Sequence, residues 1–373
     1  MKRITVIFIA MLFVFTLAAC GTQTAQVVSP DDTLPQDIVT PTPTPEPATE
    51  SETTLEPESE PEPIEPIYSI VATTFPQYDW VRRIIGDRAG YFELTLLLDN
   101  QIDLHNYQPS VSDIVKIGTS DMFIYVGGES DDWTDDVLRQ APNQDIVAIS
   151  LMESLGSSLK LEEILEGMEL DDDDDHGHSH SHDDDDDDDD DDEEHYDEHV
   201  WLSLRNAVML SHSITDAISE MDPEYADSYK ANLNAYIAEL TSLDVEFQKA
   251  VNAANIDTLL FASRFPFLYL ADDYGLHCYA AFSGCSAETE ASFATIVFLT
   301  NKVDELNLRS IMVTECSDQS IAKTIINNSS GGDKQILVMN AIQSITANDV
   351  SSGVTYLSLM EGNLDVLIEA LAN

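Results

Sequence analysis

Basic residues are scarce in this sequence. Lys and Arg make up 16 of its 373 residues against 70 Asp and Glu, and the formal net charge is -54 at pH 7. A protein that binds nucleic acid needs a basic surface to replace the counterions of the phosphates, so this deficit excludes that class of function. An excess of carboxylates is compatible with the binding of cations. The length is sufficient for two domains.

Long hydrophobic runs are also missing after residue 20, so we expect no membrane-spanning segment in the rest of the chain. Residues 1–20 are typical of a secretion signal, in which Lys2 and Arg3 precede an apolar run that is short for a membrane span. The sequence LAACG at residues 17–21 resembles the lipobox of bacterial lipoproteins. This resemblance implies a lipid on Cys20 and an extracytoplasmic protein anchored to the cell membrane without spanning it. An ordinary secretion signal with a chance cysteine is the alternative.

Cysteine is rare in the remainder of the chain, where only Cys278, Cys285 and Cys316 follow. An exported protein can hold disulfides, but an odd number of cysteines allows at most one pair within the chain. Cys278 and Cys285 are the nearest candidates in sequence. A bond between them requires Cα atoms within about 7 Å of each other.

Two segments have compositions that oppose folding. Residues 21–66 are rich in proline and glutamate, and we predict a disordered spacer there because proline lacks a backbone donor and like charges repel. Residues 169–198 hold aspartate tracts without Lys or Arg, which predicts an unfolded loop. The loop contains His176, His178, His180, His182 and His195. It is either a solvated charge run or a flexible segment that captures metal ions weakly and concentrates cations by its charge.

Short β-rich runs alternate with helical patterns in two parts of the chain, residues 67–220 and 255–373. This alternation predicts parallel sheets covered by helices, and therefore an α/β fold. The predicted strands are residues 68–74, 92–98, 122–126 and 146–149 in the first part and 258–262, 311–313 and 335–339 in the second. Between the two parts, apolar residues recur at steps of three and four from Tyr225 to Val251, which predicts one long helix within residues 221–254.

Histidines outside the acidic loop are few: His105, His199, His212 and His277. His105 follows a predicted strand by a short turn, and ligands bind beyond the carboxyl ends of strands in open α/β sheets. We interpret His212 and His277 as structural.

The segments around two of these histidines resemble those of a known family. The sequence DLHNYQP at residues 103–109, with Asp113 after it, resembles the D-x-H-x-Y-x-P-x-x-x-D segment of the solute-binding proteins of zinc and manganese ABC importers. The sequence DEHVWLS at residues 197–203 resembles their D-x-H-x-W-L-S segment. Residues 72–76 and 269–276 match as well, so the resemblance covers about residues 68–373. It implies two Rossmann-like parallel-sheet lobes joined by a single long rigid helix, with a metal ion between the lobes.

The resemblance also implies a function without catalysis. The protein would capture a divalent transition metal outside the cell, zinc first with manganese as the alternative, and deliver it as a monomer to an ABC permease driven by an ATPase. His105 and His199 are then metal ligands from the first lobe, since neutral imidazole is a zinc ligand. The histidine-rich acidic loop before His199 is typical of the zinc members of the family.

The second-lobe ligands of that family are not found in this sequence. Their positions align with Arg264, which has no lone pair to donate, and with Asn340, whose amide is a poor zinc ligand. We predict that Glu315, at the end of a strand, completes the site, and Cys285 or Glu288 is the alternative. A further alternative is a weak site, with the loop responsible for more of the capture. Arg264 needs a carboxylate partner in each case, because an unpaired cation beside Zn²⁺ is unfavourable.

Two other functions fit parts of the sequence. His195, Glu198 and His199 match the H-x-x-E-H pattern of inverted zinc metalloproteases, which requires both histidines on one face of a helix. A binding protein requires His105 beside His199 instead. A surface adhesin is the remaining alternative, and no residue of the sequence identifies its partner.

Overall fold

The computed structural model describes residues 66–100, 102–168, 195–286 and 290–372, which belong to one compact unit. The predictions about Cys20, the spacer before residue 66, the four alternating loop histidines and Glu288 lie outside the described residues. Each helix within the described ranges is too short or too polar to cross a membrane.

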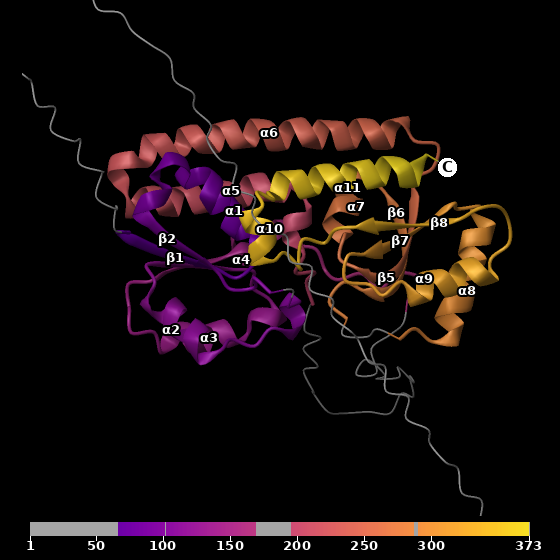
Figure 1. The fold of residues 1–373 in the computed structure, drawn as a ribbon, viewed down its shortest axis with the longest axis horizontal. Helices are drawn as coiled ribbons and strands as arrows, with labels where there is room; N and C mark the ends of the chain where they lie inside the picture. The colour runs from indigo at the N-terminus through magenta and orange to yellow at the C-terminus, as the bar shows by residue number, and fades with distance from the viewer. Residues whose placement is uncertain (1–65, 101, 169–194, 287–289, 373) are drawn as a thin grey trace, which may run out of the picture. The chain divides into compact units, whose positions relative to one another are not determined.

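The first lobe contains a four-stranded parallel sheet with the strand order β2-β1-β3-β4 (Figure 1). Its strands are β1 (Tyr68–Ala72), β2 (Phe92–Leu96), β3 (Met122–Tyr125) and β4 (Val147–Ser150). Its helices are α1 (Phe75–Ile85), α2 (Val111–Thr119), α3 (Trp133–Arg139), α4 (Leu151–Leu155) and α5 (Leu204–Met221). The strands predicted for this part of the chain are therefore present, with ends shifted by a few residues.

The second lobe contains another four-stranded parallel sheet, with the order β6-β5-β7-β8. Its strands are β5 (Thr258–Phe265), β6 (His277–Ser283), β7 (Ser310–Thr314) and β8 (Gln335–Met339). Its helices are α7 (Leu268–Tyr274), α8 (Phe293–Glu305), α9 (Ser320–Asn328), α10 (Ala347–Ser351) and α11 (Tyr356–Leu371). The three strands predicted from sequence are confirmed, and β6 is an additional strand at the edge of this sheet.

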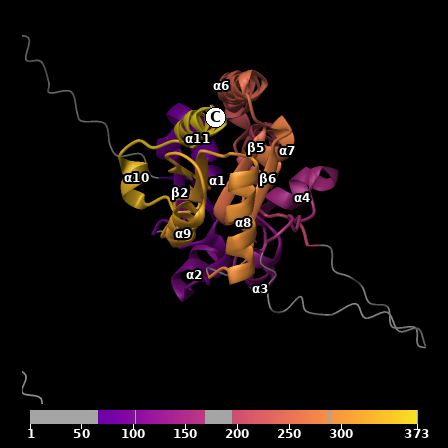
Figure 2. The ribbon, with the colours of Figure 1, turned by 90° about the vertical axis from the view of Figure 1, so that its right-hand side faces the viewer.

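Alternate residues of β5 are buried against opposite faces of the second sheet. Leu260 and Ala262 belong to an apolar cluster with residues of α8 and α9, whereas Leu259 and Phe261 belong to the main core with residues of α11. Figure 2 shows α11 on one side of this sheet and α8 and α9 on the other. Because side chains alternate along a strand, a sheet covered on both faces needs apolar residues at successive positions. This is why residues 259–262 of β5 form an unbroken apolar run in the sequence.

The long helix predicted between the lobes is α6 (Ala226–Ala253), which has 28 residues. It runs alongside both lobes (Figure 1) and packs against α5, α1 and α11. Its buried stripe consists of Tyr229, Leu233, Tyr236, Leu240, Leu243 and Phe247. The predicted fold class is confirmed: two parallel-sheet α/β lobes joined by one long helix.

The sequence analysis did not predict α5, α7 or β6. On α5 the buried face includes Ser211, Thr215 and Ser219, whose polar character hides the apolar stripe. The hydroxyls of Thr215 and Ser219 donate to carbonyls one turn earlier, at 2.8 and 2.7 Å, so they are buried without loss of hydrogen bonding. Between α7 and β6, Gly275 has a φ of 68° and turns the chain within a very short connection.

The two lobes share one hydrophobic core and are joined by buried hydrogen bonds. The indole Nε1 of Trp201 donates to the carbonyl of Ala341 at 2.9 Å. The hydroxyl of Tyr356 donates to the carbonyl of Trp201 at 2.6 Å, and its backbone N–H donates to the carboxylate of Asp79 at 2.9 Å. Because breaking such bonds leaves buried polar groups unsatisfied, these contacts oppose separation of the lobes.

Candidate metal centre

His105 and His199 are each held by an aspartate two positions earlier. Asp103 caps the short helix Leu104–Asn106 that follows β2, and its carboxylate accepts the backbone N–H of His105 at 3.1 Å. Asp197 accepts the backbone N–H of His199 at 2.8 Å, just before the short helix Val200–Leu202. Each histidine thus lies in an Asp-x-His turn, defined as residues 103–105 and 197–199. The repeated motif D-x-H in the sequence has a structural cause, because the aspartate fixes the backbone that carries the ring.

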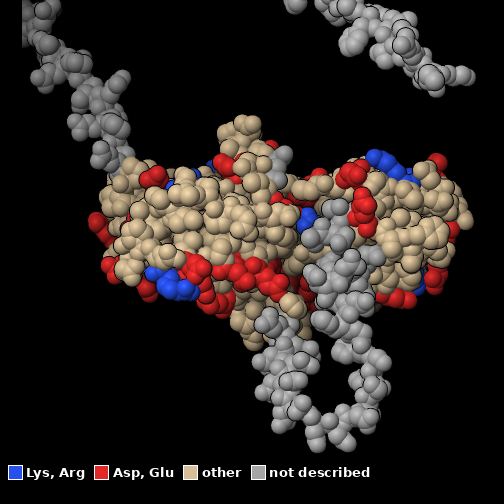
Figure 3. Space-filling model, turned by 90° about the horizontal axis from the view of Figure 1, so that it is seen from below, with Lys and Arg blue, Asp and Glu red and all other residues tan. Residues whose placement is uncertain are grey.

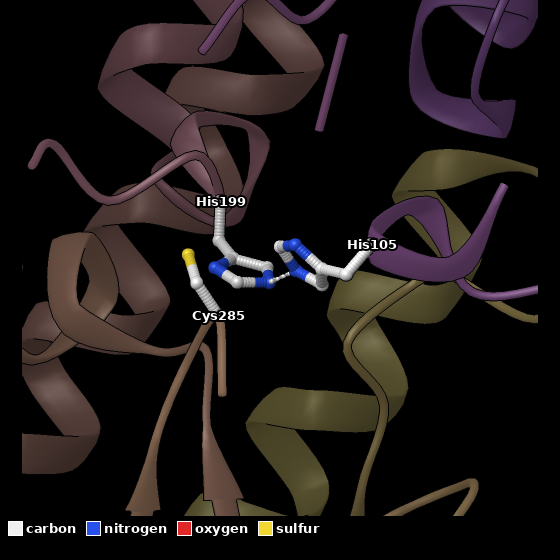
Figure 4. Close-up of side chains that lie close together, drawn as sticks. All are labelled: His105, His199 and Cys285. Atoms are coloured by element: carbon white, nitrogen blue, oxygen red, sulfur yellow. Dashed lines mark hydrogen bonds between the residues drawn. The ribbon is translucent and has the colours of Figure 1, made fainter. Parts of the chain in front are cut away.

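The two turns bring the imidazoles together although they are 94 positions apart in the chain. The Nε2 atoms of His105 and His199 lie 3.2 Å apart, and the ring centroids are 5.1 Å apart. Figure 4 shows these two Nε2 atoms pointing toward each other. The side chain of His199 is fully buried and that of His105 is 8% exposed, so the pair is almost closed to solvent.

The other ring nitrogens have partners that orient the pair. The Nδ1 of His199 lies 3.1 Å from the Asp197 carboxylate, which is an acceptor for Nδ1–H, and a neutral ring with its proton on Nδ1 keeps the lone pair of Nε2. The Nδ1 of His105 lies 2.7 Å from the hydroxyl of Ser130 and 3.5 Å from Glu198. Glu198 also accepts the backbone N–H of Ser130 at 2.9 Å. The sequence analysis missed Asp197, Ser130 and Glu198 as orienting groups.

The protonation of the two rings is not equivalent. Burial and the charge of His199 lower the pKa of His105 well below its ordinary value. Burial also opposes protonation of His199, but the Asp197 carboxylate outweighs it and raises the pKa of His199. The pair therefore accepts one proton more readily than two. At 3.2 Å the two Nε2 atoms lie within hydrogen-bonding distance, so one ring can donate Nε2–H to the lone pair of the other, and a metal ion can take the place of that hydrogen.

Cys285, just after β6, is the third member of the cluster. One potential ligand atom from each of His105, His199 and Cys285 lies within 4.8 Å of the others. The thiol lies beside the His199 ring, on the side away from His105 (Figure 4). Burial, together with the negative charges of Asp197 and Glu162, raises the pKa of the Cys285 thiol, so it is protonated when no metal is bound. Cys278 and Cys285 are both free thiols, and the disulfide considered from sequence is not formed.

Arg264, at one of the altered family positions, pairs with Asp103. Its guanidinium extends from β5 of the second lobe to the Asp103 carboxylate of the first lobe, and it also donates to the carbonyl of Ser286 at 3.4 Å. Burial raises the pKa of Asp103, but the charges of Arg264 and His105 and their hydrogen bonds outweigh it and lower that pKa. Arg264 thus has the carboxylate partner that the sequence analysis required.

Glu315 is not in the cluster that contains the histidines, and both Glu315 and Asn340 bond to backbone N–H groups elsewhere. The carboxylate of Glu315 accepts the backbone N–H groups of Ala341 and Gln343 at 2.8 and 3.4 Å. The side-chain oxygen of Asn340 accepts the N–H of Ile342 at 2.7 Å. Both side chains therefore stabilise the turn after β8, in which Ile342 has a φ of 60°. The predicted role of Glu315 as third ligand receives no support from this geometry.

His195 and His199 do not form a protease site. Residues 195–199 are not helical, so the H-x-x-E-H pattern does not place its two histidines on one helix face. The side chain of His195 is 57% exposed and pairs with Glu129, while His199 is fully buried beside His105. The metalloprotease alternative is therefore wrong, and the arrangement is the one required of a binding protein.

Two parallel-sheet lobes joined by a long helix, with two facing histidines of the first lobe beside Cys285 of the second, fit the class of two-lobed metal-binding proteins. Residues 70–370 match the model of the family described as "ZnuA: Zinc-uptake complex component A periplasmic", and the chain belongs to this family.

Individual relatives agree with this assignment. The zinc-binding lipoprotein AdcA of Streptococcus pneumoniae (strain ATCC BAA-255 / R6) is 30% identical over 299 residues, which are 80% of this chain and 55% of AdcA. The chain thus spans about half the length of that relative. The high-affinity zinc uptake system protein ZnuA of Bacillus subtilis (strain 168) is 26% identical over 81% of this chain and 87% of its own length. The Zn(II)-bound ZnuA-like domain of S. pneumoniae AdcA has a TM-score of 0.62 and 27% identity, covering 82% of this chain and 99% of that domain.

Proposed function

We propose that this protein captures Zn²⁺ outside the cytoplasm and delivers it to an ABC permease that is driven by an ATPase. The observation that carries the proposal is the pair of Nε2 atoms of His105 and His199, 3.2 Å apart, with both Nδ1 atoms held by other groups. The relatives named above are described as zinc-binding or zinc-uptake proteins, which supports zinc over manganese.

The spacing of the pair suits a tetrahedral zinc ion. Imidazole nitrogens bind Zn²⁺ at about 2.0–2.1 Å, and two such ligands at a tetrahedral angle are about 3.3 Å apart. The observed 3.2 Å between the Nε2 atoms is close to that separation. A zinc ion can therefore replace the hydrogen between the two Nε2 atoms with little movement of the rings. Zinc ligation by histidine is also strengthened when the other ring nitrogen donates to a carboxylate, as that of His199 does.

Export and attachment are part of the same proposal. Residues 1–20 direct secretion, a lipid on Cys20 anchors the chain, and the residues up to 66 act as a spacer between membrane and lobes. The aspartates and histidines of residues 169–194 increase the local concentration of metal ions and pass them to the histidine pair. Asp and Glu side chains also gather on the face of the first lobe shown in Figure 3, which favours the approach of cations. The protein acts as a monomer. Within the residues that the structure describes, no feature favours adhesion.

Metal titration of single-residue variants tests the proposal. We expect His105→Ala and His199→Ala each to abolish the tight Zn²⁺ site, measured by competition with a chromophoric chelator. His212→Ala, which removes an exposed histidine of α5, is the matched control and should bind as the wild type does. A deletion of residues 169–194 should slow zinc uptake while leaving the tight site. Loss of tight binding in the deletion alone, with both alanine variants unaffected, would overturn the assignment to the histidine pair.

A further inference from the structure

The second lobe offers one metal-ligating side chain to the histidine pair. Within the described ranges, His105, His199 and Cys285 form the only group of three or more His, Cys, Asp or Glu residues whose ligand atoms cluster closely enough to hold one ion. The residues at the family's second-lobe positions are engaged elsewhere: Arg264 with Asp103, and Asn340 with the turn after β8. Cys285 is therefore the group available to complete the donor set.

The backbone before Cys285 fits closely against the His199 ring because residue 284 is glycine. A Cβ on Gly284 would lie 3.1 Å from both Cε1 and Nδ1 of His199 and 3.0 Å from the carbonyl oxygen of Phe265. Contacts this short are rarely tolerated, so any side chain here would push the end of β6 away from the ring. The absence of a side chain at Gly284 brings Cys285 next to the histidine pair.

A segment of the first lobe fixes Cys285 from the other side. The carboxylate of Glu162 accepts the backbone N–H of Cys285 at 3.0 Å. The same segment is paired with the second Asp-x-His turn, since the N–H of Asp197 donates to the carbonyl of Lys160 at 2.9 Å. Residues 160–162 thus hold both the carboxylate that orients His199 and the backbone that carries the thiol. Such shared support is what a site built from two lobes needs in order to keep its ligands together.

Metal ligation requires the thiol to turn toward the two Nε2 atoms by rotation about its own Cα–Cβ bond, because it lies on the far side of the His199 ring (Figure 4). Cysteine is unbranched at Cβ and exchanges among staggered rotamers, whereas the two imidazoles are held by their Nδ1 partners. Coordination replaces the S–H bond by an S–metal bond, and the proton leaves to solvent. The step involves no change of oxidation state.

We propose that the thiolate of Cys285 is the third metal ligand, which makes the site a His₂Cys site selective for thiophilic dications such as Zn²⁺, Cd²⁺ and Co²⁺. This inference rests on the proposed function, because it requires the histidine pair to bind metal. A thiolate is a soft donor that favours zinc and its congeners, while manganese and magnesium prefer carboxylate and carbonyl oxygen. Arg264 and Asn340 stand at the positions of the family's second-lobe ligands and do not bind the metal. The sulfur of Cys285 then takes the place of one lost ligand, so the donor type changes.

Cobalt substitution in the full chain tests the proposal. A Co²⁺–thiolate bond gives a sulfur-to-metal charge-transfer band in the near ultraviolet, and the acidic loop contains no cysteine that could produce it. We expect the band in the wild type and in Cys278→Ser, the control for another part-buried free thiol, and its absence in Cys285→Ser. Zinc affinity should fall by more than about tenfold in Cys285→Ser, while the weak affinity for Mn²⁺ should stay the same.

Two outcomes separate failure of this inference from failure of the proposed function. If Cys285→Ser keeps the band and wild-type zinc affinity, while His105→Ala loses binding, the thiolate ligand is refuted and the histidine site stands. If the wild type binds neither Zn²⁺ nor Co²⁺ tightly, the proposed function itself fails. A measurement on the wild type alone guards against a misfolded variant: Zn²⁺ should slow alkylation at Cys285 and leave the exposed Cys316 unaffected. Equal alkylation of Cys285 with and without zinc would also refute the ligand.

Discussion

The two Asp-x-His turns have the same local geometry and different electrostatic roles. In the second turn, Asp197 serves its own histidine twice, through the backbone N–H and through Nδ1. In the first turn, Asp103 holds only the backbone of His105 and pairs across the lobes with Arg264, while the ring is oriented by the Ser130 hydroxyl. The Nδ1 of His199 is thus hydrogen-bonded to a carboxylate, whereas the Nδ1 of His105 is hydrogen-bonded to a hydroxyl and lies farther, at 3.5 Å, from the Glu198 carboxylate.

This difference explains why the two histidines differ in basicity although they share one site. His199, next to a negative charge, is the more basic ring, and the pKa of His105 is lowered. The repeated Asp-x-His motif thus fixes the backbone at both histidines, while the group bonded to each Nδ1 decides how basic the ring is.

The largest effect on stability is expected from Arg264→Gln, which acts on the first turn alone. In this variant the carboxylate of Asp103, whose side chain is 12% exposed, loses the cationic partner that Arg264 provides. Removal of one partner from a buried pair costs about 3–5 kcal/mol of unfolding free energy, which urea unfolding of the metal-free protein measures. Arg205→Gln is the control. The Arg205 side chain pairs with Asp244 and Asp273 but is 47% exposed, so its substitution should lower the unfolding free energy by less than about 1 kcal/mol. A double variant with Asp103→Asn should recover part of the loss, and no recovery would show that the ion pair is not its cause.

Asp197→Asn acts on the second turn and should weaken zinc binding by about 10–100-fold. The amide keeps the shape of the side chain but removes the charge that makes His199 a stronger donor. Competition titration with a chelator measures the change, and Asp216→Asn on the exposed face of α5 is the control. Unchanged affinity in Asp197→Asn would mean that the carboxylate only positions the backbone, as Asp103 does.

A pH effect is expected from Asp131, which lies next to Ser130. Burial raises the pKa of Asp131 to about 7, although its carboxylate accepts the backbone N–H groups of Val126 and Gly127. Between about pH 4 and 7 the folded protein retains a proton that the unfolded chain has lost, so this group makes stability fall as pH rises, by up to about 1.4 kcal/mol per pH unit. In Asp131→Asn the unfolding free energy should fall less steeply with pH over this range. Above pH 7 the curves of unfolding free energy against pH should be parallel for the variant and the wild type. Identical slopes from pH 4 to 7 would contradict the raised pKa.

The smallest effect is expected from Ser130→Ala. It removes one neutral hydrogen bond to the His105 ring, worth about 1 kcal/mol, so zinc affinity should fall by only several-fold. Isothermal titration at fixed pH measures the difference from the wild type. If Ser130→Ala lowered zinc affinity as much as Asp197→Asn does, the proposed difference between the two turns would be wrong, because a hydroxyl would then contribute as much as a carboxylate.

The sequence predicted the fold well where the local pattern and the packing agree. The apolar run in β5 corresponds to a sheet that helices cover on both faces, and the apolar stripe on α6 corresponds to the side that packs against other helices. Both elements appear at the expected positions. The pattern failed for α5, where the buried hydroxyls of Thr215 and Ser219 are hydrogen-bonded within the helix and make its core-facing side look polar in the sequence. The predicted approach of His105 to His199 is confirmed as a contact.

The second-lobe side of the site was less predictable for a physical reason. Glu315 has the right chemistry and follows a strand, but sequence does not show that backbone N–H groups of the turn after β8 would engage its carboxylate. Cys285 was an alternative without a geometric argument, because the features that place it are a missing side chain at Gly284 and a carboxylate 123 positions away, on Glu162. Contacts of that kind are properties of the folded chain and carry no local signature.

The core that runs across both lobes links metal supply to the lifetime of the protein. Trp201, two positions after His199, is hydrogen-bonded to Ala341 and Tyr356 of the second lobe, so the site does not open without loosening contacts between the lobes. A ligand that binds only the folded state stabilises it by mass action, and proteases cleave the fraction that is open. In a zinc-starved cell, proteases outside the cytoplasm would therefore degrade this protein faster than in a zinc-replete cell.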